Sequence, residues 1–190
     1  MGIRLQVVAL STTVLGSGCG FFFEPTPDLE TKKTVEAAGL QVDYPGNWEA
    51  VVEAEDVEGT MFTTVTIESS GNALAMIQVF EPAVAIGPQE AFAAFIDGMK
   101  EAASAEFGGV FELSVRGEEA FSRDVLAQTW DGRTGTVEVE VFGEKVPNRI
   151  QTLQRTTEDE TIIIIAQAPI EDWAKVEPGF DAIYDGLVER

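Results

Sequence analysis

Cys19 is the first residue of this chain whose chemistry is informative, because a thiol can serve as a nucleophile, a metal ligand or a site of acylation. It is the single cysteine among 190 residues, and the chain contains no histidine. Cysteine nucleophiles and thiol-containing zinc sites usually need a histidine partner, and a lone cysteine cannot form a disulfide within its own chain. The residues around Cys19 must therefore show whether acylation is its chemistry.

The residues before Cys19 have the layout of an export signal. Arg4 is followed by an apolar stretch from Leu5 to Leu15, and small residues occupy positions 16–18. Ordinary signal peptidase cleaves after such small residues, and the segment 15–19 also looks like a bacterial lipobox, in which the acylated cysteine becomes the mature N-terminus. We favour the lipobox, because it consumes a thiol that would otherwise be exposed and reactive. Its leucine stands four residues before the cysteine, where lipoboxes usually have it three before. The stretch is well below the roughly 20 apolar residues that a membrane helix needs.

Three segments follow from this interpretation: a lipoprotein-type signal peptide at 1–18, a lipidated N-terminus with a flexible linker at 19–38, and one domain at 39–190. The linker is predicted because Pro25 and Pro27 lie in a polar stretch without an apolar period. The predicted location is the cell envelope, with the protein anchored to a bacterial membrane either on the outer membrane facing the periplasm or at the cell surface.

Three aromatic residues directly follow the predicted anchor. Phe21, Phe22 and Phe23 are candidates for contact with the membrane interface beside an acylated Cys19. Packing of the same residues on the domain is the alternative.

A second group of residues with chemical potential is the acidic segment "EAEDVEG". It places Glu53, Glu55, Asp56 and Glu58 in one predicted loop, which is a candidate surface for a basic protein partner. Clustered carboxylates can also hold calcium, but this spacing does not match an EF-hand loop, so a solvated loop is favoured and no metal site is predicted.

No motif predicts catalysis. The chain has no G-x-S-x-G elbow, no P-loop and no C-x-x-C pair, so no catalytic residue and no cofactor are predicted. Trp48, Trp130 and Trp173 are interpreted as core anchors, with a ligand groove as the alternative.

The charge of the chain narrows the range of partners. The formal net charge is −21, from 12 basic and 33 acidic residues. Nucleic acid is not a predicted partner, because phosphate binding needs clustered Lys and Arg, and an anionic membrane surface would repel the domain. The acidic surface fits general solubility, a saline habitat or a basic protein partner.

The elements that position these residues are mainly strands. Alternating or continuous apolar residues predict strands at 40–44, 48–52, 60–68, 73–82, 109–117, 125–130, 136–142, 149–156 and 161–168. Turns are predicted at Pro45-Gly46 and Asp131-Gly132. Residues 60–68 and 73–82 are expected to form an antiparallel hairpin, and 73–82 to be a central strand because it is apolar on both faces. Apolar spacing predicts an amphipathic helix over 88–106 and a C-terminal helical region interrupted near Pro178-Gly179. The predicted fold class is α+β, a three-layer sandwich of a mainly antiparallel sheet flanked by helices.

Three stretches resemble a known family. "AGLQVDYPGNWEA", "GPQEAFAAFIDGMK" and "IIIIAQAPIEDWAKVEPGFDAIYDGLVE" resemble the PsbP-like domains, the PsbP/DcrB-type α/β/α sandwich group, over Gly39 to Val188. The resemblance implies an antiparallel sheet flanked by helices and a non-enzymatic role in binding or stabilising another macromolecule. It identifies no partner, and no functional side chain is carried over from it.

Two functions remain in competition. The first is a lipid-anchored envelope protein that binds a protein partner in an assembly or chaperone-like role. The second is a carrier of an apolar ligand or lipid in a cleft between sheet and helix, using the helix face around Phe92 and Phe95. An enzyme that uses carboxylates alone ranks third.

Overall fold

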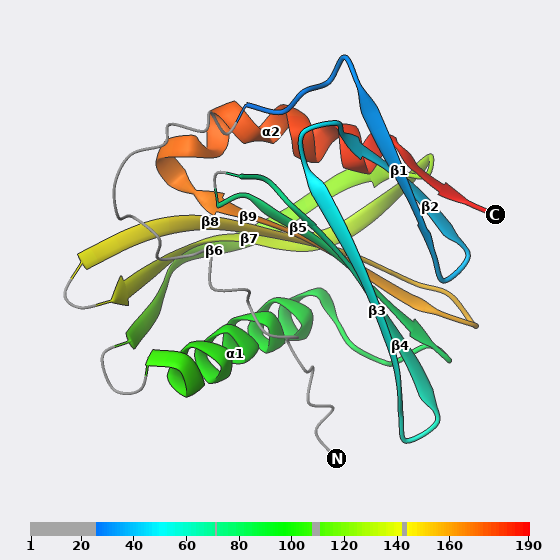
Figure 1. Cartoon of the computed structure of the whole chain (residues 1–190). Helices are drawn as coiled ribbons and strands as arrows, with labels where there is room; N and C mark the ends of the chain where they lie inside the picture. Colours follow the sequence, from blue (N-terminus) through cyan, green and yellow to red (C-terminus); the bar gives the residue numbers. More distant parts are fainter. Residues whose placement is uncertain (1–25, 71, 108–110, 142–143) are drawn as a thin grey trace.

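The computed structural model describes residues 26–70, 72–107, 111–141 and 144–190, so Cys19 and Phe21–Phe23 lie outside the described residues (Figure 1). Ten strands and two helices follow one another along this part of the chain: β1 Lys32–Ala37, β2 Leu40–Pro45, β3 Glu49–Val57, β4 Thr60–Glu68, β5 Leu74–Glu81, α1 Pro88–Phe107, β6 Phe111–Val125, β7 Gln128–Val141, β8 Glu144–Thr156, β9 Thr161–Pro169, α2 Ile170–Asp185 and β10 Leu187–Glu189.

The strands form two sheets. The larger sheet has the order β3-β4-β5-β9-β8-β7-β6, and the smaller has the order β1-β2-β10, with every neighbouring pair antiparallel. Helix α1 covers one face of the larger sheet, while α2 and the smaller sheet lie over the other face (Figure 1). The predicted three-layer α+β sandwich is confirmed.

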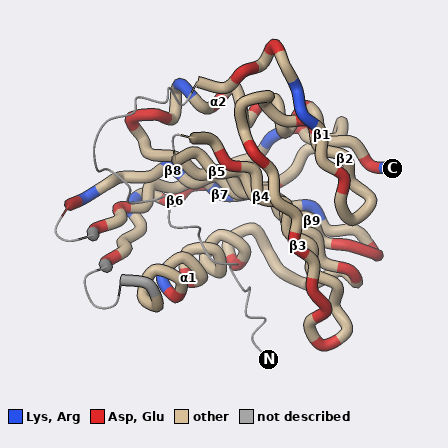
Figure 2. The backbone as a smooth tube through the Cα atoms, in the orientation of Figure 1, with Lys and Arg blue, Asp and Glu red and all other residues tan. Residues whose placement is uncertain are grey.

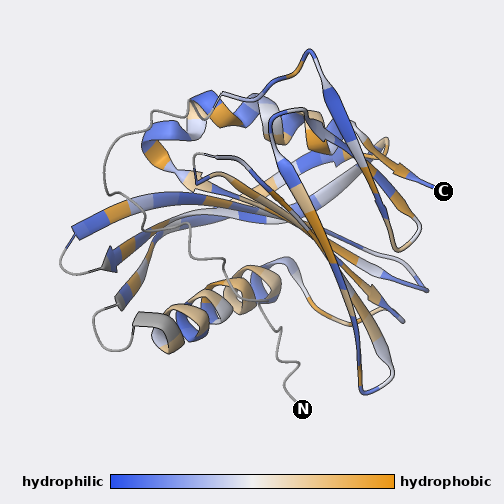
Figure 3. Ribbon diagram, viewed as in Figure 1, coloured by the Kyte–Doolittle hydropathy of each residue, from blue (hydrophilic) through white to orange (hydrophobic). Residues whose placement is uncertain are grey.

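The centre of the larger sheet is covered on both faces, as its sequence predicts. β5 and β9 are paired along their length, and their residues are buried except for Glu81. The four consecutive isoleucines of β9 point alternately to the two faces, because successive side chains of a strand alternate. Ile162 and Ile164 belong to the core under α2, and Ile163 and Ile165 to the core under α1. The middle strands are accordingly the most hydrophobic part of the sheet (Figure 3).

Trp48 anchors the core under α2. It is fully buried and its ring meets that of Phe180 edge to face, with 5.6 Å between ring centroids. A Cβ on Gly179 would lie 2.7 Å from Cζ2 of Trp48, so only a glycine lets the helix approach the indole this closely. Trp173 also packs against Phe180, at 5.3 Å between centroids.

The linker prediction is wrong for Lys32–Ala37. These residues form β1, which pairs with β2 from Lys32↔Pro45 to Ala37↔Leu40. Lys33 Nζ donates hydrogen bonds to the Trp48 carbonyl at 2.9 Å and to Glu49 at 2.7 Å. The folded domain therefore begins before Gly39.

Two predicted breaks are also wrong. Helix α2 continues through Pro178 to Asp185. Proline has no N–H group, so the carbonyl of Ala174, one turn earlier, lacks its helical hydrogen bond, and Ala174 is exposed. Asp131-Gly132 lies inside β7 instead of at a turn. The turn is at Leu126-Ala127, both with positive φ, in the middle of the strand predicted over 125–130.

The segment around Pro45-Gly46 joins two sheets instead of two neighbouring strands. β2 belongs to the smaller sheet and β3 is the edge strand of the larger one. No helix in the described part of the chain is long and apolar enough to cross a membrane.

Candidate functional site

The acidic segment 53–58 forms the outer strand and the turn of the β3–β4 hairpin, so the prediction of a loop is wrong for Glu53, Glu55 and Asp56. Val57 pairs with Thr60, which leaves Glu58 and Gly59 as a two-residue turn, both with positive φ. The Gly59 N–H donates to Oδ1 of Asp56 at 2.8 Å and closes this turn.

The strand separates the four predicted acidic residues. Glu53 lies opposite Thr64 and Glu55 lies opposite Phe62, so these two carboxylates share one face of the sheet. Asp56 points to the other face, because successive side chains of a strand alternate, and Glu58 is at the turn. These carboxylates therefore do not converge on one ion. Among the described residues no group of three or more potential ligands could hold a metal.

Glu53 and Glu55 line a cavity of about 430 Å³ together with Ala54, Phe62 and Thr64. Thr64 is only 2% exposed, and its hydroxyl has no hydrogen-bond partner in the described structure. Gln78 lies opposite Thr64 on β5, is 1% exposed, and has an Oε1 atom that is likewise unpartnered. The cavity thus combines two carboxylates and an aromatic ring with the buried, unpartnered hydroxyl of Thr64, and Gln78 lies next to Thr64 on the neighbouring strand.

The charges of segment 53–58 are uncompensated within the described structure, whereas Glu49 at the start of β3 pairs with Lys33. No Lys or Arg occurs between Lys33 and Lys100, and none of the four acidic residues of segment 53–58 forms an ion pair within the described ranges. The far half of the sheet, strands β6 to β8, carries basic residues instead: Arg116, Arg123, Arg133, Lys145, Arg149 and Arg155. Figure 2 shows red without blue along the β3–β4 hairpin. The sheet therefore has one acidic edge and a mixed far half.

The same edge exposes apolar side chains. Val51 is 59% exposed, Val52 42%, Val57 47% and Met61 42%. Among the described strands β3 is the last one of the sheet, so its outer backbone groups have no partner strand there. Apolar side chains, carboxylates and free backbone groups together are the features of a surface that can bind an extended polypeptide. We call residues 49–64 of this hairpin the acidic edge.

The helix face that the ligand-carrier alternative would use is filled. Phe92 is 2% exposed and Phe95 1%, and both belong to the core between α1 and the sheet. A Cβ on Gly135 would lie 2.9 Å from the Phe92 ring, so the packing here is close. These two residues do not present an open apolar surface.

Trp48, Trp130 and Trp173 are all buried, which confirms them as core anchors. Trp173 has a second contact that the sequence did not predict, since the Arg149 guanidinium lies over its ring at 4.7 Å. The lipidation candidate Cys19 and the membrane-contact candidates Phe21, Phe22 and Phe23 are not among the described residues.

Sequence reasoning missed Phe62 and Thr64, because their relation to Glu53 and Glu55 depends on strand register. A signal for the acidic edge was nevertheless present, since the long stretch without Lys or Arg between residues 33 and 100 can be read directly from the sequence.

The clear pKa shifts in the described structure do not create a general acid or base near neutral pH. Hydrogen bonds from Thr31 lower the pKa of Asp28, and the hydrogen bond from Lys145 lowers the pKa of Glu138. The same hydrogen bond raises the pKa of Lys145, and burial raises the pKa of Tyr184. Each shift strengthens the protonation state that the group already has at neutral pH.

Comparison with protein-family models and with curated proteins finds no match. The fold is similar to that of cyanobacterial PsbP (CyanoP) from Synechocystis sp. PCC 6803, with a TM-score of 0.52 and 14% identity over 91% of this chain and 98% of that one. LpqN, a protein involved in cell envelope biogenesis of Mycobacterium tuberculosis, matches with a TM-score of 0.42 and 9% identity over 83% and 90%. A Bacteroides thetaiotaomicron protein matches with a TM-score of 0.42 and 16% identity over 80% and 45%. The domain has a PsbP-like fold.

Proposed function

We propose that this protein is a lipid-anchored, non-enzymatic protein of the cell envelope that binds or stabilises a basic protein partner through the acidic edge. The observation that carries the proposal concerns the four carboxylates of segment 53–58 at the edge strand β3 and its turn. They form no ion pair among the described residues, whereas Glu49 at the start of β3 pairs with Lys33 and ion pairs are frequent elsewhere in the domain. Uncompensated like charge on one surface attracts a partner of opposite charge and speeds its association.

Strand geometry indicates how such a partner would bind. The two residues that flank a two-residue turn, here Val57 and Thr60, form backbone hydrogen bonds with each other. Along an antiparallel pair of strands, residue pairs with and without these hydrogen bonds then alternate. The N–H groups of Val52, Ala54 and Asp56 consequently point away from β4. An extended segment can pair with them as an added strand, and its basic side chains would then reach Glu53 and Glu55 on the cavity face.

The lipid anchor is supported by the sequence alone. The signal-like segment ends in small residues directly before Cys19. An anchor would hold the domain in the envelope, and the acidic surface would keep it from lying flat on anionic lipid.

The binding proposal can be tested by neutralising the acidic edge. The acylated protein is isolated from its own envelope by native pull-down, next to a variant that combines Glu53→Gln, Glu55→Gln, Asp56→Asn and Glu58→Gln. A matched control combines Glu112→Gln, Glu144→Gln, Glu158→Gln and Asp159→Asn, which removes as much charge from exposed positions elsewhere.

We expect the captured partner to be lost with the acidic-edge variant and kept with the control. Its association rate with the wild-type protein should fall about tenfold or more as salt rises to physiological strength, where charges are screened over about 8 Å. Equal capture by both variants, or an association rate that does not respond to salt, would reject the acidic edge as the binding surface.

A further inference from the structure

Arg149 differs from the other arginines of the described structure. Three of them lie over aromatic rings: Arg123 over Tyr184, Arg155 over Trp130 and Arg149 over Trp173. Arg123 also pairs with Asp181, and Arg155 pairs with Glu160 at 2.9 Å. Arg149 has neither a carboxylate nor any hydrogen-bond acceptor within the described ranges, although the chain has 33 acidic residues.

Arg149 lines a cavity, and its guanidinium has no carboxylate partner among the described residues. About 420 Å³ of space lies beside Arg149, where β7, β8 and the bulge of β6 at Gly117 meet the start of α2. Thr136 lies opposite Arg149 on the neighbouring strand and also lines the cavity. Ile170 and Trp173 give it an apolar wall, and Glu119 also lines it.

The stacked position of Arg149 leaves its hydrogen-bonding capacity unused. A guanidinium over an aromatic ring interacts with the ring through its flat face, and its N–H groups still point outward in the plane of the guanidinium. Two neighbouring N–H groups of the guanidinium match the two oxygens of a carboxylate and can bind it with two parallel hydrogen bonds. The half-buried position of Arg149 strengthens such an interaction relative to one in open water.

The surroundings select for a single negative charge. One arginine can neutralise one charge, while Glu119 and the acidic surface of the protein disfavour a dianion such as phosphate. The apolar wall of Ile170 and Trp173 favours a ligand that carries an apolar group next to its carboxylate.

We infer that this cavity binds a monoanionic carboxylate with an apolar body, held by Arg149 and placed against Trp173. The ligand is either a small free carboxylate or the C-terminal residue of a polypeptide, since both present the same chemistry. The site lies on the far half of the sheet from the acidic edge and does not depend on the function proposed above.

The inference can be tested on the intact domain by NMR, following the indole N–H signal of Trp173. Hexanoate serves as a probe for a free carboxylate, and N-acetyl-leucine as a probe for a polypeptide C-terminus. N-acetyl-leucinamide has the same body without the charge, and inorganic phosphate tests for a dianion. We expect saturable shifts with at least one carboxylate probe, and the probe that binds more tightly identifies the source.

Arg149→Gln should weaken that binding by at least about tenfold, and Arg149→Lys should weaken it less, because it keeps the charge and loses the two neighbouring N–H groups. Arg123→Gln is the matched control, since Arg123 also stacks on a ring of α2 but already has its carboxylate. It should leave binding unchanged. Unaltered positions of the other indole signals would show that each variant is folded.

Three outcomes of the binding measurements on the wild-type protein would overturn the inference. They are equal binding by the amide and the acid, tighter binding of phosphate than of either carboxylate, and the absence of saturable binding by both carboxylate probes. Equal loss in the Arg123→Gln and Arg149→Gln variants would also overturn it, because it would point to a general structural effect.

Discussion

Trp48 shows how much of this fold depends on one side chain. It is fully buried, contacts Phe180 and occupies the space left by the missing side chain of Gly179. We predict that Trp48→Ala lowers the free energy of unfolding by roughly 3 to 5 kcal/mol, as large-to-small aromatic core substitutions do. Urea denaturation measures this loss. Trp48→Phe should cost less, since the indole N–H has no partner in the described structure, and a loss below about 1 kcal/mol for the alanine variant would contradict a core role.

Glu138 is the residue from which a pH dependence is expected. Its carboxylate accepts hydrogen bonds from Lys145 and Arg116, both at 2.9 Å, and the Lys145 hydrogen bond is the main cause that lowers the pKa of Glu138 below its ordinary value of 4.5. A group whose pKa is lower in the folded state stabilises the fold above its unfolded pKa, and this contribution is lost as pH falls through the folded pKa.

Glu138→Gln should therefore lower stability at neutral pH and make the decline in acid shallower. Denaturation curves at neutral pH and at about pH 3 would measure both effects. The control is Glu112→Gln, which removes an exposed carboxylate without an ion pair in the described part of the chain. A steeper acid decline for Glu138→Gln than for the wild type would refute the assignment.

At the scale of elements, β1 contributes more than its sequence suggests. It pairs with β2 over six residues, and Val35 and Ala37 pack against the core. A chain that begins at Gly39 should lose about 2 kcal/mol or more of unfolding free energy relative to one that begins at Thr26, because it exposes the edge of β2 and this part of the core. Thermal denaturation of the two chains compares them. Equal midpoints would restore the interpretation of residues 26–38 as a linker.

Strong periodicity in the sequence predicted the elements that bury the most apolar surface. The helix expected over 88–106 is observed as Pro88–Phe107, and the run of four isoleucines is a central strand. β1 was missed because its sequence, "KKTVEA", alternates only weakly. The acidic residues of segment 53–58 predict a loop because they are unfavourable in strands, but pairing with the nine residues of β4 overrides that preference.

The cavities could not be predicted, because each depends on contacts between distant residues. Glu53 and Glu55 meet Phe62 only through the register of the hairpin. Arg149 meets Trp173 only because α2 folds back over β8, and the bulge at Gly117 has no clear pattern in the sequence. The uneven distribution of charge along the chain, in contrast, can be read from the sequence.

At the scale of the whole molecule, attachment to the envelope is the first property to test. We predict that Cys19→Ser releases the protein from membranes, because the serine cannot be acylated in place of the thiol. Membrane fractionation at high salt compares the variant with the wild type. Retention of the variant on membranes in unchanged amount would reject the lipid anchor, and it would make Phe21, Phe22 and Phe23 the leading candidates for membrane attachment.

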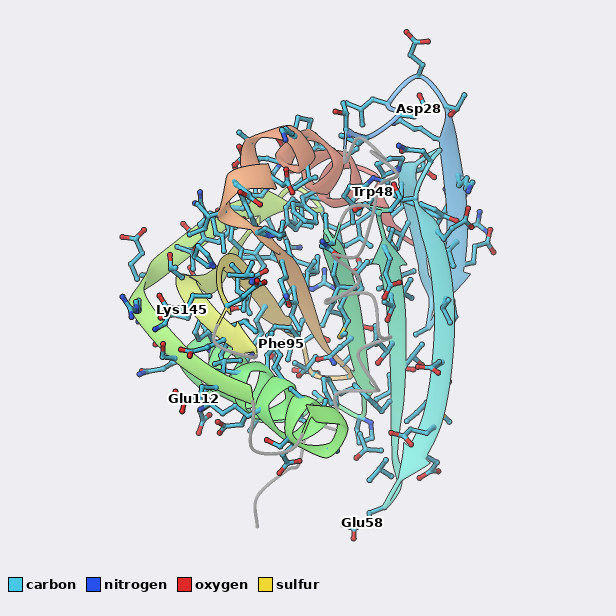
Figure 4. The ribbon with its side chains drawn as sticks, turned by 60° about the vertical axis from the view of Figure 1, so that its left-hand side comes forward. Asp28, Trp48, Glu58, Phe95, Glu112 and Lys145 are labelled. Atoms are coloured by element: carbon cyan, nitrogen blue, oxygen red, sulfur yellow. The ribbon has the colours of Figure 1, made fainter. Side chains whose placement is uncertain are left out.

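With an acylated Cys19, the early start of the folded domain would limit how far the protein can stand from a membrane. Only six residues lie between Cys19 and Thr26, and the seven Cα–Cα steps across them span at most about 25 Å when the chain is fully extended. Asp28 and Glu58 lie at opposite ends of the molecule (Figure 4). A tether this short would keep the Asp28 end low, close to the lipid headgroups, and lift the tip of the β3–β4 hairpin to the greatest height above them. The protein would then hold the acidic tip of the β3–β4 hairpin at a fixed distance from the bilayer, where partners in the aqueous space can reach it.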